Sequence, residues 1–189
     1  GKEKTNVSHA SNPTILSDIF LRVGGVKDAL MIVTYGMEIN SNDVVGDHFW
    51  IWRADHGTGV SWYKNKAQNG LVVNGDNVTI YGLCNEHFQE YQTLWNGEYG
   101  KTFFYQSETP YDPPSQDKYM SHDGTVEGYA SYKVADHVKH HYACMMGIYD
   151  VFIQTSNKIA IRSSIEVPNA NDVKIHNACN VCLSGAKGG

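Results

Sequence analysis

The sequence predicts an all-β chain folded as a β-solenoid, and two observations support this prediction. First, 17 valines and 12 isoleucines stand against 7 leucines, and β-branched side chains favour strands over helices. Second, one pattern recurs in segments 37–44, 71–78 and 165–173. Each segment begins with two apolar residues separated by one other residue, continues with a turn rich in Asn, Asp or Gly, and ends with Asp or Asn followed by Val. A strand, an Asn-rich bend and a second strand form one corner of a solenoid coil, and stacked coils pair their strands with one another.

The spacing of the repeat predicts the number of coils. The three segments start 34 and 94 residues apart. If one coil takes roughly 20–30 residues, these distances correspond to one long coil and about four coils, so we expect about six to eight coils in all. Further short strands are predicted at 15–23, 101–106, 128–134, 148–153 and 158–161.

Two segments are predicted to be long loops that leave one side of the solenoid. Residues 86–99 are dense in aromatic side chains, and residues 109–124 contain three prolines that interrupt regular structure. A β-sandwich is the alternative architecture, but its two-residue hairpin turns are scarce, because Asn96-Gly97 is the only clear one outside the repeats.

Length and charge limit the function classes. A chain of 189 residues is long enough for one domain and short for two. We expect a single β-helix domain over 1–189 that is a portion of a longer protein, with an extended leading segment at 1–13 and a linker-like tail at 184–189. The formal net charge of −5 and the presence of only three arginines argue against a nucleic-acid partner. No stretch reaches the ~20 apolar residues of a membrane span.

The cysteines and histidines favour neither a metal nor a cofactor. Cys179 and Cys182 have C-x-x-C spacing, but no second cysteine pair lies nearby to complete a zinc site. On a regular strand these two residues point to opposite faces, and buried thiols or a local disulfide are the favoured interpretation. The acid–histidine pairs Asp55-His56 and Glu86-His87 are taken as separate, and neither these pairs nor His137 with its neighbours match a metal motif.

Aromatic and acidic residues concentrate between positions 47 and 112, which indicates a sugar-binding cleft. All four tryptophans lie in this part of the chain, together with eight carboxylates. Flat aromatic faces pack against sugar rings, and a glycosidase needs one protonated acid and one base or nucleophile beside the scissile bond. For any single residue, ordinary packing or surface exposure is the alternative.

Six short motifs in order resemble the family-55 glycoside hydrolases. The motifs are W-x-W-x-A-D-H at 50–56, N-G-L at 69–71, Y-G at 81–82, E-H at 86–87, Y-Q at 91–92 and E-T-P-Y at 108–111. Members of that family are secreted exo-β-1,3-glucanases with two tandem right-handed β-helix domains, and the motif order looks like their second domain. The chain is also similar to bacterial secreted pectate-lyase-like β-helix proteins that often carry discoidin-type domains. The resemblance covers about residues 14–184.

The resemblance implies a secreted, inverting β-1,3-glucan hydrolase with a right-handed parallel β-helix fold and no cofactor. It implies that Glu108 is the general acid and Glu86 the second acidic group, and either Glu86 or Asp55 would then orient the attacking water. Two Asn-x-Ser/Thr sequons, at Asn6 and Asn77, agree weakly with secretion. The residues expected to bind sugar are Trp50, Trp52, Trp62, Gln92, Trp95, Tyr105, Gln106 and Tyr111.

The alternative is a structural or glycan-binding β-solenoid without catalysis. Gly57-Thr58-Gly59 follows the A-D-H motif where the family usually has acidic residues, and the family places part of its active site on a first domain that this chain lacks. An open coil end exposes unpaired strand edges. We therefore expect either a missing N-terminal β-helix domain or self-association end to end.

Overall fold

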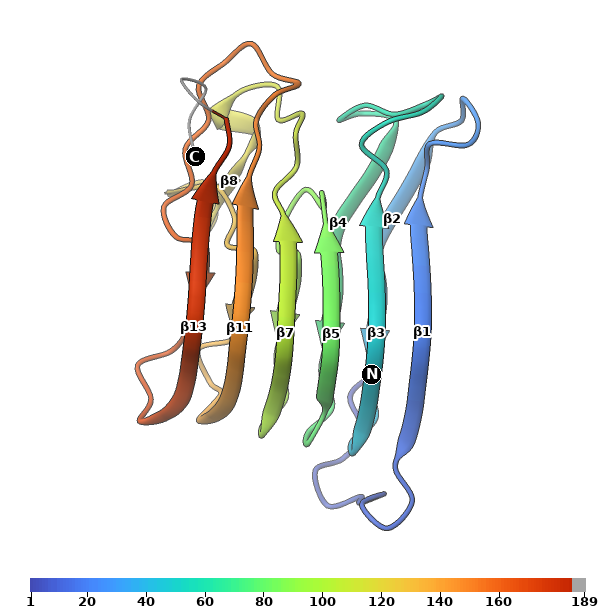
Figure 1. Ribbon diagram of the computed structural model, residues 1–189, viewed down its shortest axis with the longest axis vertical. Helices are drawn as coiled ribbons and strands as arrows, with labels where there is room; N and C mark the ends of the chain where they lie inside the picture. The colour runs from blue at the N-terminus through green and yellow to red at the C-terminus, as the bar shows by residue number, and fades with distance from the viewer. Residues whose placement is uncertain (185–189) are drawn as a thin grey trace.

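The computed structural model describes residues 1–184, and their strands wind as a parallel β-helix. The front sheet contains six strands in the order β1 (Thr14–Val23), β3 (Val44–Arg53), β5 (Thr79–Glu86), β7 (Gly100–Glu108), β11 (His140–Asp150) and β13 (Asp172–Cys182). The back sheet contains five, in the order β12 (Ile165–Glu166), β10 (Tyr132–Val134), β6 (Thr93–Trp95), β4 (Asn65–Val73) and β2 (Met31–Ile39). The chain rises along the front sheet, crosses behind it at the top, descends, and advances towards β13 with every turn, which is a right-handed path (Figure 1).

The coils differ in length, and the shortest one corrects an expectation. Val45 pairs with Thr79, 34 residues later, and Thr79 pairs with Lys101, only 22 residues later. Segment 86–99 is therefore not a loop leaving the solenoid but part of a compact coil that contains β6. Its aromatic side chains misled the prediction because Phe88 and Trp95 are fully buried in the core.

Segment 109–124 does leave the solenoid, as expected. Together with the residues up to β10 it carries the short helical turn η1 (Gln116–Lys118) and the antiparallel pair β8 (Met120–Ser121) and β9 (Val126–Glu127). The long connections meet at the top of the front sheet, whereas the turns at the bottom are short, apart from the leading segment (Figure 1). The expectation of long loops on one side is confirmed.

The additional strands are found with mixed accuracy. The strands expected at 15–23 and 101–106 lie within β1 and β7. Those expected at 128–134 and 148–153 overlap only β10 and the end of β11, and 158–161 lies outside the named strands.

The three repeated segments are corners from the back sheet to the front sheet, and asparagines stack there. Asn74 Nδ2 donates to Asn40 Oδ1 and Asn96 Nδ2 donates to Asn74 Oδ1, each at 2.8 Å. A second series runs beside it, in which one corner side chain accepts from the backbone N–H of the next corner. These bonds join Asn42 Oδ1 to Asp76 N, Asp76 Oδ1 to Glu98 N, and Glu98 Oε2 to His140 N.

The leading segment takes part in this second series. Glu3 Oε2 accepts from the backbone N–H of Asn42 at 2.9 Å, and the Glu3 N–H donates to the Asn40 carbonyl. Residues 1–13 therefore begin as a corner of the same kind. At the other end, Ser184 accepts from the backbone N–H of Phe152 and donates to the Asp150 carbonyl. The rest of the predicted tail, 185–189, lies outside the described residues.

Gly97→Ala is expected to lower the free energy of unfolding by on the order of 3 kcal/mol, because the new methyl group would overlap backbone. A Cβ on Gly97 would meet the carbonyl oxygen of Gly75 in the corner beneath it. Urea unfolding followed by circular dichroism measures the loss. Gly147→Ala is the control, since its Cβ would meet only the movable Tyr149 side chain. Equal effects at both positions would contradict the stacked-corner explanation.

Every front-sheet strand contains one residue in the left-handed region, and the six form a continuous row. Their φ angles lie between 52° and 65°, and the residues are Asp18, His48, Gly82, Phe104, Met145 and Asn177. The register of each strand pair skips this position. The skipped residue acts as a bulge, so the inward and outward alternation changes phase halfway up the sheet.

Phe104→Gly is expected to stabilise the protein by about 1 kcal/mol, because glycine adopts a positive φ without the Cβ penalty. Phe104 is exposed, so its removal costs little packing. Lys101→Gly, also exposed and on the same strand β7, is expected to destabilise by a similar amount. Thermal melting of the two variants provides the comparison, and a loss of stability in both would refute strain at Phe104.

Candidate active site

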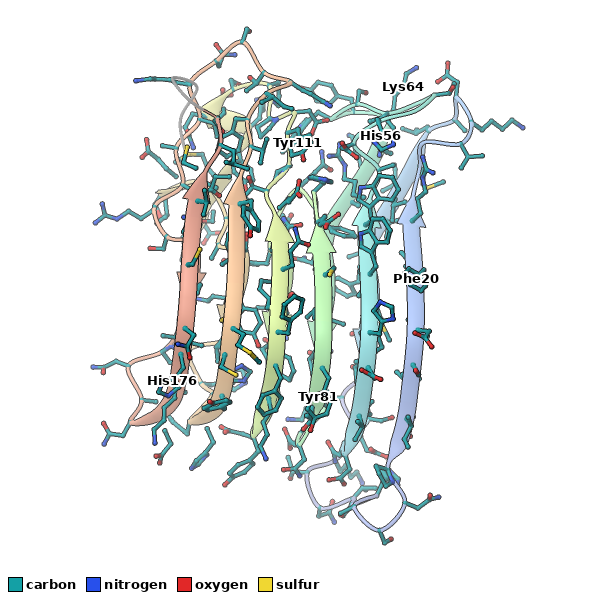
Figure 2. All side chains as sticks on the ribbon, in the orientation of Figure 1. Phe20, His56, Lys64, Tyr81, Tyr111 and His176 are labelled. Atoms are coloured by element: carbon teal, nitrogen blue, oxygen red, sulfur yellow. The ribbon has the colours of Figure 1, made fainter. Side chains whose placement is uncertain are left out.

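Two glutamates lie side by side on the outer face of the front sheet. Trp52 pairs in register with Glu86, and Glu86 pairs with Glu108, so one row runs across β3, β5 and β7 near their upper ends. Adjacent strands are about 4.8 Å apart. The phase change at the left-handed row turns these side chains outward while Ile51 and Asn85 face the core. Figure 2 shows Tyr111 and His56 at the same upper end of the sheet.

Glu86 is partly buried beside the Trp50 indole. Trp50 Nε1 donates to Glu86 Oε2 at 3.0 Å. Burial raises the pKa of Glu86, the indole hydrogen bond opposes that rise, and the nearby Glu108 and Asp55 carboxylates add to it. Glu86 is therefore a stronger proton acceptor than an ordinary surface glutamate.

Glu108 is held by polar groups on three sides. Tyr111 donates its phenol hydrogen to Glu108 Oε2, and Gln106 Nε2 lies 3.4 Å from Glu108 Oε1. His87 Nε2 lies 3.8 Å from Glu108 Oε2. The Glu108 side chain is 27% exposed, so it is open to a ligand from the outer face.

His87 joins the two acid–histidine pairs that the sequence analysis treated as separate. Its Nδ1 donates to the Thr109 carbonyl at 3.0 Å, which leaves Nε2 facing Glu108 and, at 4.0 Å, Asp55. Asp55 in turn accepts from His56 Nδ1 at 2.9 Å. Burial lowers the pKa of His87 despite these carboxylates, so the ring is neutral at neutral pH and its Nε2 lone pair faces the acids.

Aromatic side chains extend the site towards β1. The Trp50 and Trp52 rings stack with centroids 5.6 Å apart, and the Arg22 guanidinium lies 4.6 Å above Trp52. A cavity of about 200 Å³ lies between these three residues, Phe20 and Leu21. Phe20 and Trp50 are both substantially exposed, so sugar rings could pack along this face.

Four residues expected to bind sugar lie elsewhere. Trp95 and Tyr105 are buried in the core between the sheets, and Gln92 is buried with its amide bonded to both backbone groups of Phe88. Their side chains point into the interior because they occupy inward-facing positions of their coils. Trp62 lies in a second cluster with Tyr119, away from the row of glutamates.

The interior between the sheets contains hydrogen-bonded polar side chains. Tyr105 donates to the Ser131 carbonyl at 3.0 Å and accepts from Thr93. Tyr132 bonds Thr102 and His141 in the same way. These bonds explain how phenols and hydroxyls are accommodated among the buried aliphatic side chains.

The sequence analysis missed Arg53 and Asp112 as parts of the site. They are 59 residues apart, and neither belongs to a recognisable motif of its own. Arg53 is 1% exposed and forms a two-pronged ion pair with Asp112 at 3.0 Å for each bond. The only sequence signal was that Arg53 and Asp112 directly neighbour motif residues.

The two cysteines of the C-x-x-C segment alternate as predicted, but both are exposed and neither forms a disulfide, so the favoured interpretation of buried thiols or a local disulfide is wrong. Cys179 pairs with Gly147 in the outward row of Gln106, whereas Cys182 pairs with the buried Asp150, so the two lie on opposite faces of β13. Within residues 1–184, no group of three or more His, Cys, Asp or Glu side chains is arranged to hold a metal ion. The same part of the chain contains no helix that is long and apolar enough to cross a bilayer.

Comparisons with known proteins show relatives that share the sequence and the fold of this chain. An exo-β-1,3-glucanase of Streptomyces sp. (strain SirexAA-E / ActE) is 43% identical over 185 residues, which is 98% of this chain and 30% of the relative. The solved structure of sacteLam55A from Streptomyces sp. SirexAA-E superposes with a TM-score of 0.89 at 43% identity, covering 97% of this chain and 32% of that one. A glutamate-to-alanine variant of sacteLam55A in complex with glucose gives a TM-score of 0.90 with the same coverage.

These relatives extend well beyond the present chain, which spans about a third of their length. The model of the LAM55 pectate lyase-like domain matches residues 1–108, more than half of the chain. That match contains β1 to β7, the strands that carry Trp50, Trp52, Glu86 and Glu108. The chain therefore belongs to the LAM55 pectate lyase-like domain family.

Proposed function

We propose that the protein hydrolyses β-1,3-glucan, with Glu108 as the general acid and Glu86, assisted by Asp55, as the base that activates water. The observation that carries this proposal is the register pairing of two outward glutamates beside the Trp50–Trp52 stack. It is supported by a relative named exo-β-1,3-glucanase and by a related structure in complex with glucose.

The acid step rests on the contacts of Glu108. A general acid must carry a proton when the substrate binds, and Glu108 is the residue assigned to deliver it. When Glu108 gives that proton to the departing glycosidic oxygen, the Tyr111 hydroxyl stabilises the carboxylate that forms. This contact strengthens as charge develops, which is the requirement for lowering the barrier.

The base step rests on Glu86. Its raised pKa makes it a better acceptor for the proton of the attacking water than an ordinary surface glutamate. Water oxygen bonds to the anomeric carbon as the bond to the leaving oxygen breaks. An inverting enzyme needs about 6.5–9.5 Å between its carboxyl groups, so the two glutamate side chains must splay to admit the water. Asp55 approaches His87 Nε2, as Glu108 does, and is placed to help orient the water.

Laminarin, a soluble β-1,3-glucan, provides the test. We expect release of glucose, and proton NMR of the first product should show the α-anomer that inversion produces. The β-anomer would overturn the inverting assignment. Binding of laminarin without any release of sugar would refute hydrolysis and favour the alternative of a glycan-binding solenoid.

Trp50→Phe is expected to move the acidic limb of the pH–rate profile upward by about half a pH unit. The indole N–H stabilises ionised Glu86, and its loss raises the pKa of Glu86 further. Because the base must be ionised, activity then falls at a higher pH. Measuring kcat between pH 3 and 8 checks this shift, with Trp62→Phe as the control. A shift to lower pH would contradict the role of Glu86 as base.

We also propose that the chain acts within a longer, secreted polypeptide. Apolar side chains are exposed at the open β1–β2 end, including Ile15, Leu30 and Ile32. A further β-helix coil would cover them, supplied either by a preceding domain or by a second copy. Sedimentation of the chain distinguishes these sources, since only self-association gives a concentration-dependent mass. Because a glucan polymer does not cross membranes, we expect the protein in the culture medium.

A further inference from the structure

A single buried arginine connects four segments around the acid. Arg53 Nε donates to the Asn65 carbonyl at 2.8 Å, Nη1 to the His87 carbonyl at 3.2 Å, and Nη2 to the Ser61 carbonyl at 3.1 Å. The Nη1 and Nη2 groups also donate to the two carboxylate oxygens of Asp112. A guanidinium carries five N–H donors, so these bonds can occupy all of them, and Nη2 also makes a longer contact of 3.5 Å with Asn65 Oδ1.

The pair with Asp112 places that residue in one orientation. Two parallel bonds between a planar guanidinium and a carboxylate constrain direction as well as distance. Arg53 is buried and the Asp112 side chain is 12% exposed, so water competes little for either group. The charge of Arg53 would be costly at this depth without its partner.

Asp112 directly follows Tyr111, the residue that bonds the acid. The segment from Glu108 to Asp112 is anchored in β7 at one end and on Arg53 at the other. Between these anchors, the Tyr111 hydroxyl donates to Glu108 and its ring lies edge-on against His87, with centroids 4.3 Å apart.

Arg53 also holds the second neighbour of the acid. The His87 carbonyl accepts from Arg53, and the His87 N–H donates to the Glu108 carbonyl at 2.9 Å. The ring is fixed by its bond to Thr109, so its Nε2 faces Glu108. Two side chains that meet the Glu108 carboxylate are therefore attached to one buried ion pair.

We propose that the Arg53–Asp112 ion pair is a positioning device for the general acid, which keeps Tyr111 and His87 on Glu108. This role rests on the proposed function of Glu108. A misplacement of about 1 Å in a reacting group can cost roughly 10²-fold in rate. The pair touches no substrate, so its effect should fall on kcat rather than on glucan binding.

The test compares two leaving groups in Asp112→Asn and Arg53→Lys, each of which keeps side-chain bulk but loses the two-pronged pair. Laminarin needs a proton on its departing oxygen, whereas 2,4-dinitrophenolate departs from an aryl β-glucoside without one. We expect kcat on laminarin to fall by roughly 10- to 100-fold with little change in KM. On the dinitrophenyl glucoside, kcat should change by less than about threefold.

Asp117→Asn is the matched control, because Asp117 lies in the same excursion but bonds only exposed neighbours, Ser115 and Lys118. Near-ultraviolet circular dichroism establishes whether each variant is folded. If Asp112→Asn does not fold, the kinetics of Arg53→Lys test the positioning role. Equal losses on both substrates, or unchanged kcat on laminarin, would overturn the positioning role.

A second measurement does not depend on hydrolysis. Nitrogen-15 NMR of the histidine rings should show His87 as the Nδ1–H tautomer in the unmodified protein and a mixture of tautomers in Asp112→Asn. If the unmodified protein hydrolyses neither substrate, the proposed function fails. The tautomer then decides the positioning role alone, and an unchanged His87 signal would overturn it.

Discussion

Glu108→Gln is expected to reduce laminarin hydrolysis by about 10²- to 10⁴-fold, because the amide cannot donate the proton that the leaving oxygen requires. Glutamine keeps the shape of the side chain, and its amide can still meet Tyr111, so the fold should survive. Release of reducing sugar measures the loss. On a dinitrophenyl glucoside the loss should be much smaller, since that leaving group needs no acid.

The same substitution bears on the titration of its neighbour, Glu86. In the proposed mechanism Glu108 is already neutral when Glu86 acts as the ionised base, so the titration of Glu86 should change little with glutamine at position 108, and the acidic limb of the pH profile should stay in place. Glu127→Gln, on the exposed part of β9, is the control. Laminarin hydrolysis that is unaffected by Glu108→Gln would remove Glu108 from the acid role.

Arg53→Met is expected to lower the free energy of unfolding by about 3–5 kcal/mol, because it leaves the Asp112 carboxylate without its partner in a mostly buried place. The carbonyls of Asn65, His87 and Ser61 also lose a donor. Urea unfolding measures the change, and the slope of the transition shows whether it stays two-state.

The double variant Arg53→Met, Asp112→Leu separates two contributions to stability, the unpaired charge and the loss of packing. Replacing both partners of a buried ion pair by apolar residues is often close to neutral, so this variant should recover part of the lost stability. The part of the stability that is not recovered reflects the carbonyl groups that lost the Arg53 donor. A double variant less stable than Arg53→Met alone would show that the unpaired carboxylate is not the main cost.

The solenoid was predictable because its corners are defined by local sequence. The repeats at 37–44, 71–78 and 165–173 mark three corners, and the Asn-rich turns of the first two stack through side-chain amides. Segment 86–99 was misread because aromatic density is the same in a binding loop and in a core. Only the packing of Phe88 and Trp95 between the sheets distinguishes the two.

The pair of glutamates was also within reach of the sequence, through the E-H and E-T-P-Y motifs. Glu86 and Glu108 are 22 residues apart, which is one short coil, so stacking places them side by side. Trp95, Tyr105 and Gln92 were wrongly included in the predicted sugar-binding set, because a list of residue types does not say which face each one occupies. Trp50 and Trp52 face outward, whereas Trp95 and Tyr105 face inward.

The sequence by itself determined the solenoid and its corners, since both follow from patterns within about 40 residues. It also proposed the acidic pair, through motifs that resemble a known family. The tertiary structure decided which way the side chains point and what holds them. The phase change at the left-handed row depends on six stacked strands at once, and the Arg53–Asp112 pair joins residues 59 apart. Both arise from contacts between coils, which leave no signal in any short stretch of the chain.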